Sequence, residues 1–251
     1  MLEVKHLSAG YNGDNVICNI SFTAERNKCL CIIGPNGCGK STLLKSIAHL
    51  MNYNGSITLD EKDISTFSKN ILAVKIAFLE QSPAVYFSFS VYDVVSMGRY
   101  PYSAGFLKDL SAEDESIIEN IMKELDIWDL RKSMIDEISG GQAQRVFLAR
   151  TLAQGSDVIL LDEPTKNLDI KYQIELMTFL KSWINKNDKI LIAVFHDLNL
   201  AGFFGDNAIL LKDKNIAAKG TVQEVLNSET LQAAYGIDIR KFMADSLEKW
   251  K

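Results

Sequence analysis

One glycine-rich segment constrains the fold of this chain more than any other part of its sequence. It consists of Gly34, Pro35, Asn36, Gly37, Cys38, Gly39, Lys40, Ser41 and Thr42. The segment matches the pattern Gly-x4-Gly-Lys-Ser/Thr, in which backbone N–H groups wrap phosphate groups while the lysine neutralises their outer charge. The apolar run Cys29–Ile33 precedes it, and apolar residues follow at helical spacing: Leu43, Leu44, Ile47 and Leu50. Strand, loop and helix therefore occur in the order that places a helix N-terminus at an anion. We expect nucleotide binding here, the alternative being a glycine turn capped by Ser41.

Size and composition indicate an ordinary globular chain. Its 251 residues, 47% of them hydrophobic, can form one domain with or without a subdomain. A formal net charge of −5 argues against nonspecific nucleic-acid binding, which needs a clustered cationic excess. The apolar runs are far shorter than the roughly 20 residues of a membrane-spanning helix, and Met1–Ala9 lacks the pattern of a secretory signal. We therefore expect a cytoplasmic protein with no nucleic-acid partner.

The four cysteines are Cys18, Cys29, Cys31 and Cys38. They are too few and too clustered to pin a chain of this length, so we interpret them as reduced thiols. Cys29 and Cys31 lie on one face of an expected strand, where packing in the core is favoured over metal binding.

The order of apolar patterns predicts an α/β core. Val158–Leu161 and Ile190–Phe195 are continuous apolar runs, typical of strands covered on both faces in a parallel sheet. Residues between them recur at the spacing of an amphipathic helix, from Ile174 to Ile184. The alternation of apolar residues in Val16–Ala24 indicates an antiparallel sheet near the N-terminus.

Two further regions differ from this core. Residues 82–136 read as a mostly helical insertion, with one helix capped by Ser111 and Asp114. Residues 207–251 read as a hairpin followed by short helices, the first opened by Thr221 and Glu224. We treat residues 1–251 as a single domain that carries both regions.

Two carboxylates follow the strand Val158–Leu161 directly. A carboxylate at the carboxyl end of a parallel strand, beside a phosphate loop, is where Mg²⁺ is held, so Asp162 and the hydroxyl of Ser41 are candidate metal ligands. Glu163 is a candidate general base for an attacking water. The alternative is a solvated strand end turned by Pro164.

Three other side chains are candidates by position. His196 follows the run Ile190–Phe195, so it should reach the same sheet edge and contact the γ-phosphate, although a lone histidine there can simply be a solvated residue. Gln81 ends another apolar segment and is a candidate to sense Mg²⁺ or its water. The alternative is that it is an ordinary glutamine at the end of a strand. Tyr11 offers a ring on which a purine could stack.

Together these residues resemble the motif series of an ABC ATPase. The series comprises Tyr11, Gly34–Thr42, Gln81, Ile138–Gln142, Val158–Thr165, Asn167–Asp169 and His196. The most specific part is Ser139, Gly140, Gly141 and Gln142, which phosphate-loop enzymes in general lack. The resemblance implies a P-loop NTPase core with a mixed sheet, an N-terminal antiparallel β subdomain and an inserted helical subdomain. It also implies a homodimer that hydrolyses ATP, in which Ser139–Gln142 of one copy cover the γ-phosphate held by the other.

A finer similarity points to the ATPases of iron–siderophore, haem or cobalamin importers. It lies in Met97–Tyr102 and His196–Ala201. It implies a peripheral protein on the cytoplasmic face of the membrane, with an integral membrane permease that contacts Phe87–Tyr102 and an external substrate-binding protein. Ile138, Ala143 and Lys166 depart from the usual residues of the family. None of these departures removes a reacting group, but they weaken what the resemblance implies about the partner and the cargo.

Two other classes remain open on the sequence. One is a soluble ABC ATPase that serves iron–sulfur cluster assembly. The other is a phosphate-loop kinase or GTPase that acts as a monomer, in which Ser139–Gln142 would have no role.

Overall fold

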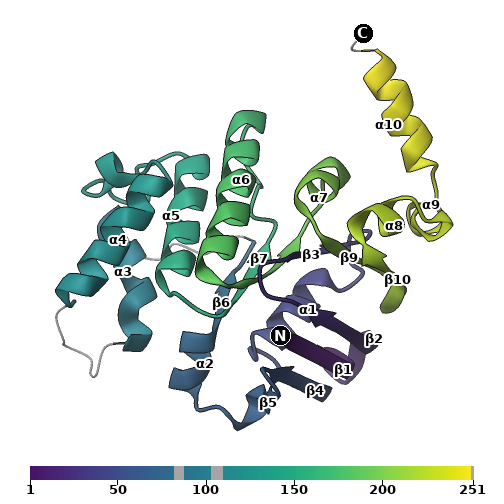
Figure 1. Cartoon of the computed structure of the whole chain (residues 1–251), viewed down its shortest axis with the longest axis horizontal. Helices are drawn as coiled ribbons and strands as arrows, with labels where there is room; N and C mark the ends of the chain where they lie inside the picture. The colour runs from purple at the N-terminus through teal and green to yellow at the C-terminus, as the bar shows by residue number, and fades with distance from the viewer. Residues whose placement is uncertain (82–87, 103–109, 250–251) are drawn as a thin grey trace.

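A computed structural model describes residues 1–81, 88–102 and 110–249 of the chain. Two sheets and the helices around them form the molecule (Figure 1). The smaller sheet is antiparallel, with the strand order β2-β1-β4-β5. Its strands are β1 (Leu2–Tyr11), β2 (Asp14–Ala24), β4 (Tyr53–Leu59) and β5 (Lys62–Asp63). The antiparallel sheet expected near the N-terminus is confirmed.

Strand β2 does not alternate along its whole length. Ile20, Phe22 and Ala24 are buried as the sequence pattern predicts, but it is Ile17, not Val16 or Cys18, that enters the core. Asn19 has φ 52°, and the pairing with β1 is irregular at this point. An extra residue in one strand of an antiparallel pair reverses which side chains face inward. Val16 is thereby left half-buried beside the phosphate loop.

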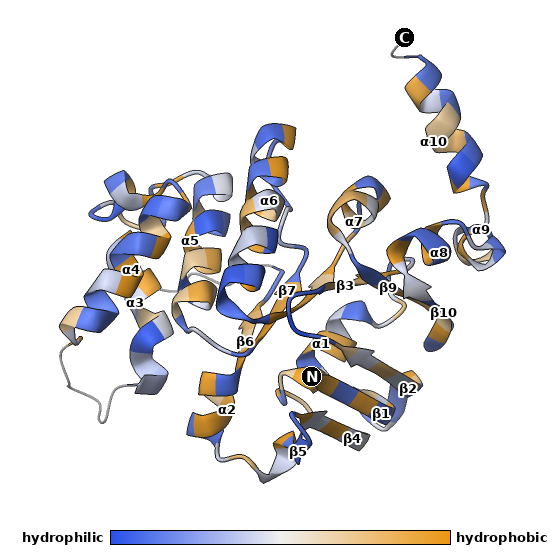
Figure 2. Cartoon of the chain, viewed as in Figure 1, coloured by the Kyte–Doolittle hydropathy of each residue, from blue (hydrophilic) through white to orange (hydrophobic). Residues whose placement is uncertain are grey.

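The larger sheet is mixed, with the strand order β10-β9-β3-β8-β7-β6. All neighbouring pairs are parallel except β9 and β10. Its strands are β3 (Cys29–Ile33), β6 (Ile76–Leu79), β7 (Val158–Asp162), β8 (Ile190–Val194), β9 (Asn207–Lys212) and β10 (Asn215–Thr221). Every residue of β3, β7 and β8 is buried, and β3 and β7 are largely orange in Figure 2. These continuous apolar runs form strands covered on both faces, as expected.

The two faces of the larger sheet contribute to two separate cores. On β3, Leu30 and Ile32 pack with the small sheet and helix α1 (Lys40–Ile47). Cys29, Cys31 and Ile33 pack on the opposite side with helices that include α5 (Gly140–Ala153), α6 (Ile170–Asn187) and α7 (Leu198–Phe204). The two cysteines are therefore core residues.

Helix α1 is shorter than the sequence pattern indicated. It ends at Ile47, and His49 has φ 56°. Leu50, expected on the apolar face of this helix, lies beyond its end and is 65% exposed. That part of the prediction was wrong, because the left-handed backbone at His49 stops the helix before a further turn forms.

Helices dominate the described parts of residues 88–136. They are α3 (Val91–Ser96), the 3₁₀ helix η2 (Met97–Tyr102), α4 (Ala112–Glu124) and the 3₁₀ helix η3 (Trp128–Leu130). The side chains of Ser111 and Asp114 form the expected capping box at the start of α4. The 3₁₀ helix η1 (Ile64–Thr66) and helix α2 (Lys69–Lys75) lie between β5 and β6 in the sequence.

The C-terminal region contains the expected hairpin and short helices. Asp213 and Lys214 join β9 to β10 with φ of 46° and 68°, as in a tight turn whose twist suits a hairpin. Thr221 and Glu224 form a capping box at α8 (Val222–Leu226). Helices α9 (Glu229–Tyr235) and α10 (Ile239–Glu248) follow, and α10 projects from the body of the molecule (Figure 1). No helix in the described part of the chain has the length and apolarity to cross a membrane.

Candidate nucleotide-binding site

The phosphate loop runs from the end of β3 to the start of α1, and its glycines are required by its shape. Gly34, Gly37 and Gly39 have φ of 146°, 78° and 102°, values that residues with a side chain rarely adopt. A Cβ on Gly34 would lie 2.3 Å from the carbonyl oxygen of Leu211. A Cβ on Gly39 would lie 2.5 Å from Cγ2 of Ile17. The loop is therefore held tightly between β9 and β2.

Lys40 is folded against this loop. Its side-chain nitrogen donates hydrogen bonds to the carbonyl oxygens of Gly34, at 2.8 Å, and Pro35, at 2.9 Å. The residue is only 7% exposed, so its ammonium group stays with the loop. This places the positive charge where a phosphate held by the loop would meet it.

Asp162 ends β7 and is the most deeply buried carboxylate of the site. It is 1% exposed, and its Oδ1 has no hydrogen-bond partner among the described residues. Burial raises the pKa of Asp162, whereas a hydrogen bond with Ser41 and the charges of Lys40 and Lys45 act in the opposite direction. A buried carboxylate oxygen without a partner, beside a hydroxyl, fits a divalent cation that prefers oxygen ligands.

No three His, Cys, Asp or Glu side chains gather into a metal site anywhere in the described ranges. The chain would thus supply Mg²⁺ with few ligands, led by Ser41 and Asp162, and phosphate oxygens and water would complete the coordination.

Glu163 and His196 form a close pair at the same sheet edge. Oε1 of Glu163 lies 2.5 Å from Nε2 of His196, and Oε2 lies 4.0 Å from the side-chain nitrogen of Lys166. Glu163 has φ 53°, a left-handed conformation that costs a non-glycine residue about 1–3 kcal/mol and persists only where the surroundings impose it. Strands β7 and β8 are parallel neighbours, so the residues that follow them meet. The sequence-based expectation that these side chains share an edge agrees with this geometry.

Gln81 and Tyr11 lie at the margins of the site. Gln81 follows β6, the parallel neighbour of β7, and the preceding Glu80 forms a 2.7 Å ion pair with Lys45 of α1. The end of β6 is thereby tied to the helix that starts at the phosphate loop. Tyr11 ends β1 and is 52% exposed. Its ring is available to a planar ligand, but no contact that the structure gives assigns one.

Ser139–Gln142 form the first turn of α5 and its cap. Oγ of Ser139 accepts a hydrogen bond from the backbone N–H of Gln142 at 3.3 Å, and Oε1 of Gln142 accepts one from the N–H of Ser139 at 2.9 Å. Ser139 and Gly140 are exposed, and a Cβ on Gly140 would meet nothing within 4 Å. No hydrogen bond or ion pair between described residues joins this turn to the phosphate loop. Gly141 of this turn instead lies near Asn167 and Leu168, since a Cβ on it would be 3.4 Å from an atom of each.

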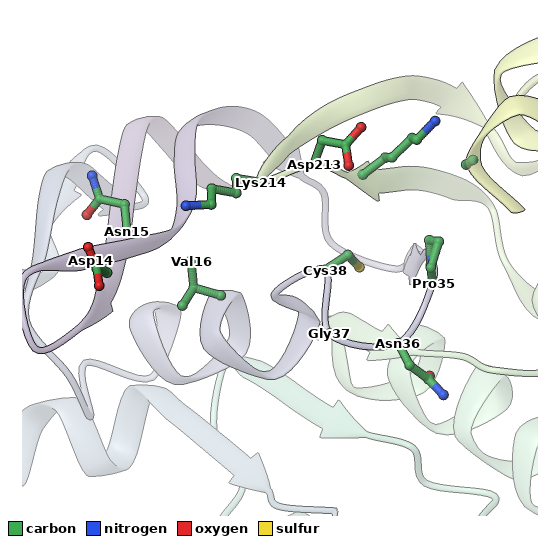
Figure 3. Close-up of a pocket in the computed structure, with 11 residues that line it drawn as sticks. Asp14, Asn15, Val16, Pro35, Asn36, Gly37, Cys38, Asp213 and Lys214 are labelled. Atoms are coloured by element: carbon green, nitrogen blue, oxygen red, sulfur yellow. The ribbon is translucent and has the colours of Figure 1, made fainter.

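A cavity of about 510 Å³ opens beside the phosphate loop (Figure 3). It lies between the start of β2, the loop and the turn that joins β9 to β10. Its lining residues are Asp14, Asn15, Val16, Pro35, Asn36, Gly37, Cys38, Lys212, Asp213, Lys214 and Ala234. The sequence analysis did not identify the turn residues Asp213 and Lys214 as neighbours of the loop. A strand parallel to β3 ends at the same sheet edge as the phosphate loop, so the residues that follow such a strand must lie near the loop. The sequence contains several apolar runs, and only the strand order shows that β9 is the neighbour of β3.

Comparisons with known proteins agree with this arrangement. A protein-family model described as ABC transporter matches residues 17–166. The "Probable siderophore transport system ATP-binding protein YusV" of Bacillus subtilis is 38% identical over 94% of this chain and 86% of its own length. The structure is similar to that of a transporter assigned to the metal-chelate type in an inward-facing conformation, with a TM-score of 0.81, 28% identity, and coverage of 94% of this chain and 88% of the other. It is also similar to the dimeric structure of MJ0796, a bacterial ABC transporter cassette, with a TM-score of 0.75, 26% identity, and coverage of 88% and 99%. The chain therefore belongs to the ABC transporter family, as one of its ATP-binding, ATP-hydrolysing subunits.

Proposed function

We propose that this chain powers the import of an iron–siderophore or related metal-chelate nutrient through a separate membrane permease. The observation that carries the catalytic part is the group of Asp162, Glu163 and His196 at one sheet edge beside the phosphate loop. The named siderophore system and the metal-chelate transporter to which the chain is similar support the class of cargo. Haem and cobalamin remain further members of that class.

The residues divide the chemistry of hydrolysis among them. Gly34–Thr42 bind the phosphates of ATP, with Tyr11 stacked on the base. Ser41 and Asp162, with Gln81 after the strand that neighbours β7, would hold Mg²⁺, and the ion would offset the charge that develops on the transferred phosphate. Glu163 orients or deprotonates the attacking water, and His196 holds the Glu163 carboxylate while facing the γ-phosphate. The left-handed backbone at Glu163 fixes where its carboxylate is presented.

A homodimer completes the site. The exposed first turn of α5 presents the Ser139 hydroxyl and glycine N–H groups, which suit an anion, and no hydrogen bond between described residues joins it to its own phosphate loop. A head-to-tail pair of copies places this turn over the nucleotide of the other copy and excludes water from the reacting phosphate. The dimeric cassette to which the chain is similar supports this arrangement.

Localisation follows from the permease. We place the protein at the cytoplasmic face of the cell membrane, held there by the permease, with an external binding protein that delivers the cargo. The segment Phe87–Tyr102 is the proposed contact with the permease; its first residue lies outside the described residues, and the remainder includes α3 and η2.

The test uses the variant Glu163→Gln. We expect it to bind ATP with unchanged affinity, to lose hydrolysis by about 10²–10⁴-fold, and to accumulate as an ATP-dependent dimer in light scattering. Unchanged hydrolysis would remove Glu163 from its role, and a monomer at saturating ATP would favour a phosphate-loop enzyme that acts alone. Membrane fractionation with a candidate permease then separates transport from cluster assembly. The cluster-assembly alternative predicts a soluble complex and no stimulation of ATPase activity by the permease.

A further inference from the structure

Arg99 points into the molecule, although it lies in the segment expected to face a partner protein. It is 8% exposed, whereas the adjacent Tyr100 is 64% exposed. Nε of Arg99 donates a hydrogen bond to Oδ1 of Asp114 at 2.6 Å, and Nη1 donates one to the carbonyl oxygen of Ala153 at 2.8 Å. Both bonds come from the planar fork of one guanidinium, a geometry that lysine cannot reproduce. The Arg99 side chain is thus engaged within the chain and joins η2 to two helices.

Tyr102 makes a second connection to the same place. Its hydroxyl donates a hydrogen bond to the carbonyl oxygen of Gln154 at 2.7 Å, and its ring lies 3.9 Å below the guanidinium carbon of Arg99. The backbone of η2 also contacts α5 directly, because a Cβ on Gly98 would lie 2.3 Å from the carbonyl oxygen of Arg150. We call this set of bonds from Arg99 and Tyr102 to Ala153 and Gln154 the η2–α5 contact. It satisfies carbonyl groups at the C-terminal end of α5 that the helix itself leaves free.

Gln154 extends the η2–α5 contact to the central sheet. Its side-chain nitrogen donates hydrogen bonds to the carbonyl oxygens of Ala73 and Ile76, the latter at 3.0 Å. Ile76 begins β6, and Gln81 follows the other end of that strand. The end of α5 is therefore bonded to η2 on one side and to the strand that leads to Gln81 on the other.

The opposite end of α5 carries Ser139–Gln142. The helix has 14 residues, so its two ends lie about 20 Å apart. A straight helix held at its C-terminal end transmits a change of orientation there to its first turn. Nearer that turn, Gln144 donates a 3.3 Å hydrogen bond to the carbonyl oxygen of Pro164.

We propose that Arg99 and Tyr102 are positioning residues that set the orientation of α5, and thereby the placement of Ser139–Gln142 against the nucleotide of the partner copy. This inference rests on the proposed two-copy site. It gives Arg99, which is 8% exposed, and the hydroxyl of Tyr102, whose side chain is 42% exposed, a role distinct from partner binding.

The experiment compares Tyr102→Phe and Arg99→Lys in a Glu163→Gln protein, which we expect to accumulate as the ATP-bound dimer. Tyr102→Phe removes one hydrogen bond and keeps the ring on Arg99, while Arg99→Lys keeps the charge beside Asp114 and loses the fork. Tyr53→Phe is the matched control, because the Tyr53 hydroxyl is buried with no hydrogen-bond partner in the described ranges. Lys123→Ala, which breaks an exposed ion pair with Glu119 on α4, is the second control. Thermal melting confirms that each variant folds.

We expect unchanged ATP binding by the monomer, since the phosphate loop is untouched. The dimer should dissociate about fivefold more readily in Tyr102→Phe, the equivalent of one hydrogen bond, and about tenfold or more in Arg99→Lys. Hydrogen exchange of the amides at 139–145 should rise in both variants and in neither control. A purely structural role would lower the melting temperature and leave these two measurements as in the parent.

Two different outcomes would contradict the proposed two-copy site and the positioning role of Arg99 and Tyr102. If the Glu163→Gln parent stays monomeric with ATP, the proposed two-copy site is wrong. If the parent dimerises and both η2 variants match it in dimer affinity and in exchange at 139–145, the positioning role of Arg99 and Tyr102 is overturned while the proposed function stands.

Discussion

Oε1 of Glu163 lies 2.5 Å from Nε2 of His196, although 33 residues separate them in the sequence. The contact exists because β7 and β8 are parallel neighbours, paired from Val158 with Ile190 to Asp162 with Val194. The residue after β7 and the second residue after β8 therefore arrive at the same edge. The imidazole of His196 thus holds Oε1 of Glu163. The other oxygen, Oε2, lies 4.0 Å from the side-chain nitrogen of Lys166.

His196→Ala should lower the rate of ATP hydrolysis at saturating ATP by about 10²-fold or more, because Glu163 loses the side chain that orients it. ATP binding should change little, since the phosphate loop holds the nucleotide. The matched control is His49→Ala, a histidine that packs edge-on against Tyr53 after α1. Steady-state hydrolysis and equilibrium nucleotide binding check the prediction, which fails if both histidine variants hydrolyse ATP alike.

Asp162→Asn should abolish hydrolysis yet stabilise the protein without nucleotide at neutral pH. Burial raises the pKa of Asp162, so the folded state favours the protonated acid. A carboxyl with a raised pKa favours folding below its unfolded pKa, and this advantage is lost as the pH rises through the folded pKa. The neutral amide avoids the cost of a buried charge, and each kcal/mol gained raises Tm by about 2–4 °C for a chain of this size.

The pH dependence separates this effect from a general one. The difference in Tm between Asp162→Asn and the parent should shrink as the pH is lowered toward the ordinary aspartate pKa of about 4, because the raised pKa of Asp162 lets the folded parent take up a proton as the pH falls. Asp129→Asn, at an exposed position in η3, should show no difference from the parent at any of these pH values. A lower Tm for Asp162→Asn at neutral pH would contradict the argument.

Ser139→Ala should cost about 1 kcal/mol of stability, because it removes the cap of α5, and it should also weaken the ATP-dependent dimer. Thr221→Ala removes the equivalent cap of α8, where Thr221 and Glu224 form the same kind of capping box. The two variants should lose similar stability in chemical denaturation. Only Ser139→Ala should dissociate in light scattering with Glu163→Gln as background, and equal dimer affinity in both would leave Ser139 as a helix cap alone.

Tyr11→Ala should weaken nucleotide binding by about 5- to 150-fold, the range that corresponds to 1–3 kcal/mol of stacking on one aromatic ring. Tyr11→Phe should bind as the parent does, since the ring is retained. Every base has a face on which to stack, so ATP and GTP affinities should fall together. Fluorescence titration with labelled nucleotides gives the result, and an unchanged affinity in Tyr11→Ala would remove this residue from the site.

Much of the site could be predicted because its parts are contiguous in the sequence. A strand, a glycine-rich loop and a helix start follow one another in Cys29–Ile47, and Asp162, Glu163 and His196 come directly after fully apolar runs. The rule that parallel strands end at one edge then brings those runs together without further information. Two details that the sequence missed each depend on a single local event, the bulge at Asn19 and the left-handed backbone at His49, which no apolar pattern records.

The amino-acid sequence by itself determined the phosphate loop, the covered parallel strands, the capping boxes of α4 and α8 and the family resemblance, because each depends on neighbours along the chain. Only the tertiary structure decided that Arg99 faces inward to Asp114 and Ala153, and that the Asp213–Lys214 turn borders the loop. Those facts depend on which strands pair and on how helices distant in sequence pack. Such contacts are fixed by the whole core rather than by any one segment.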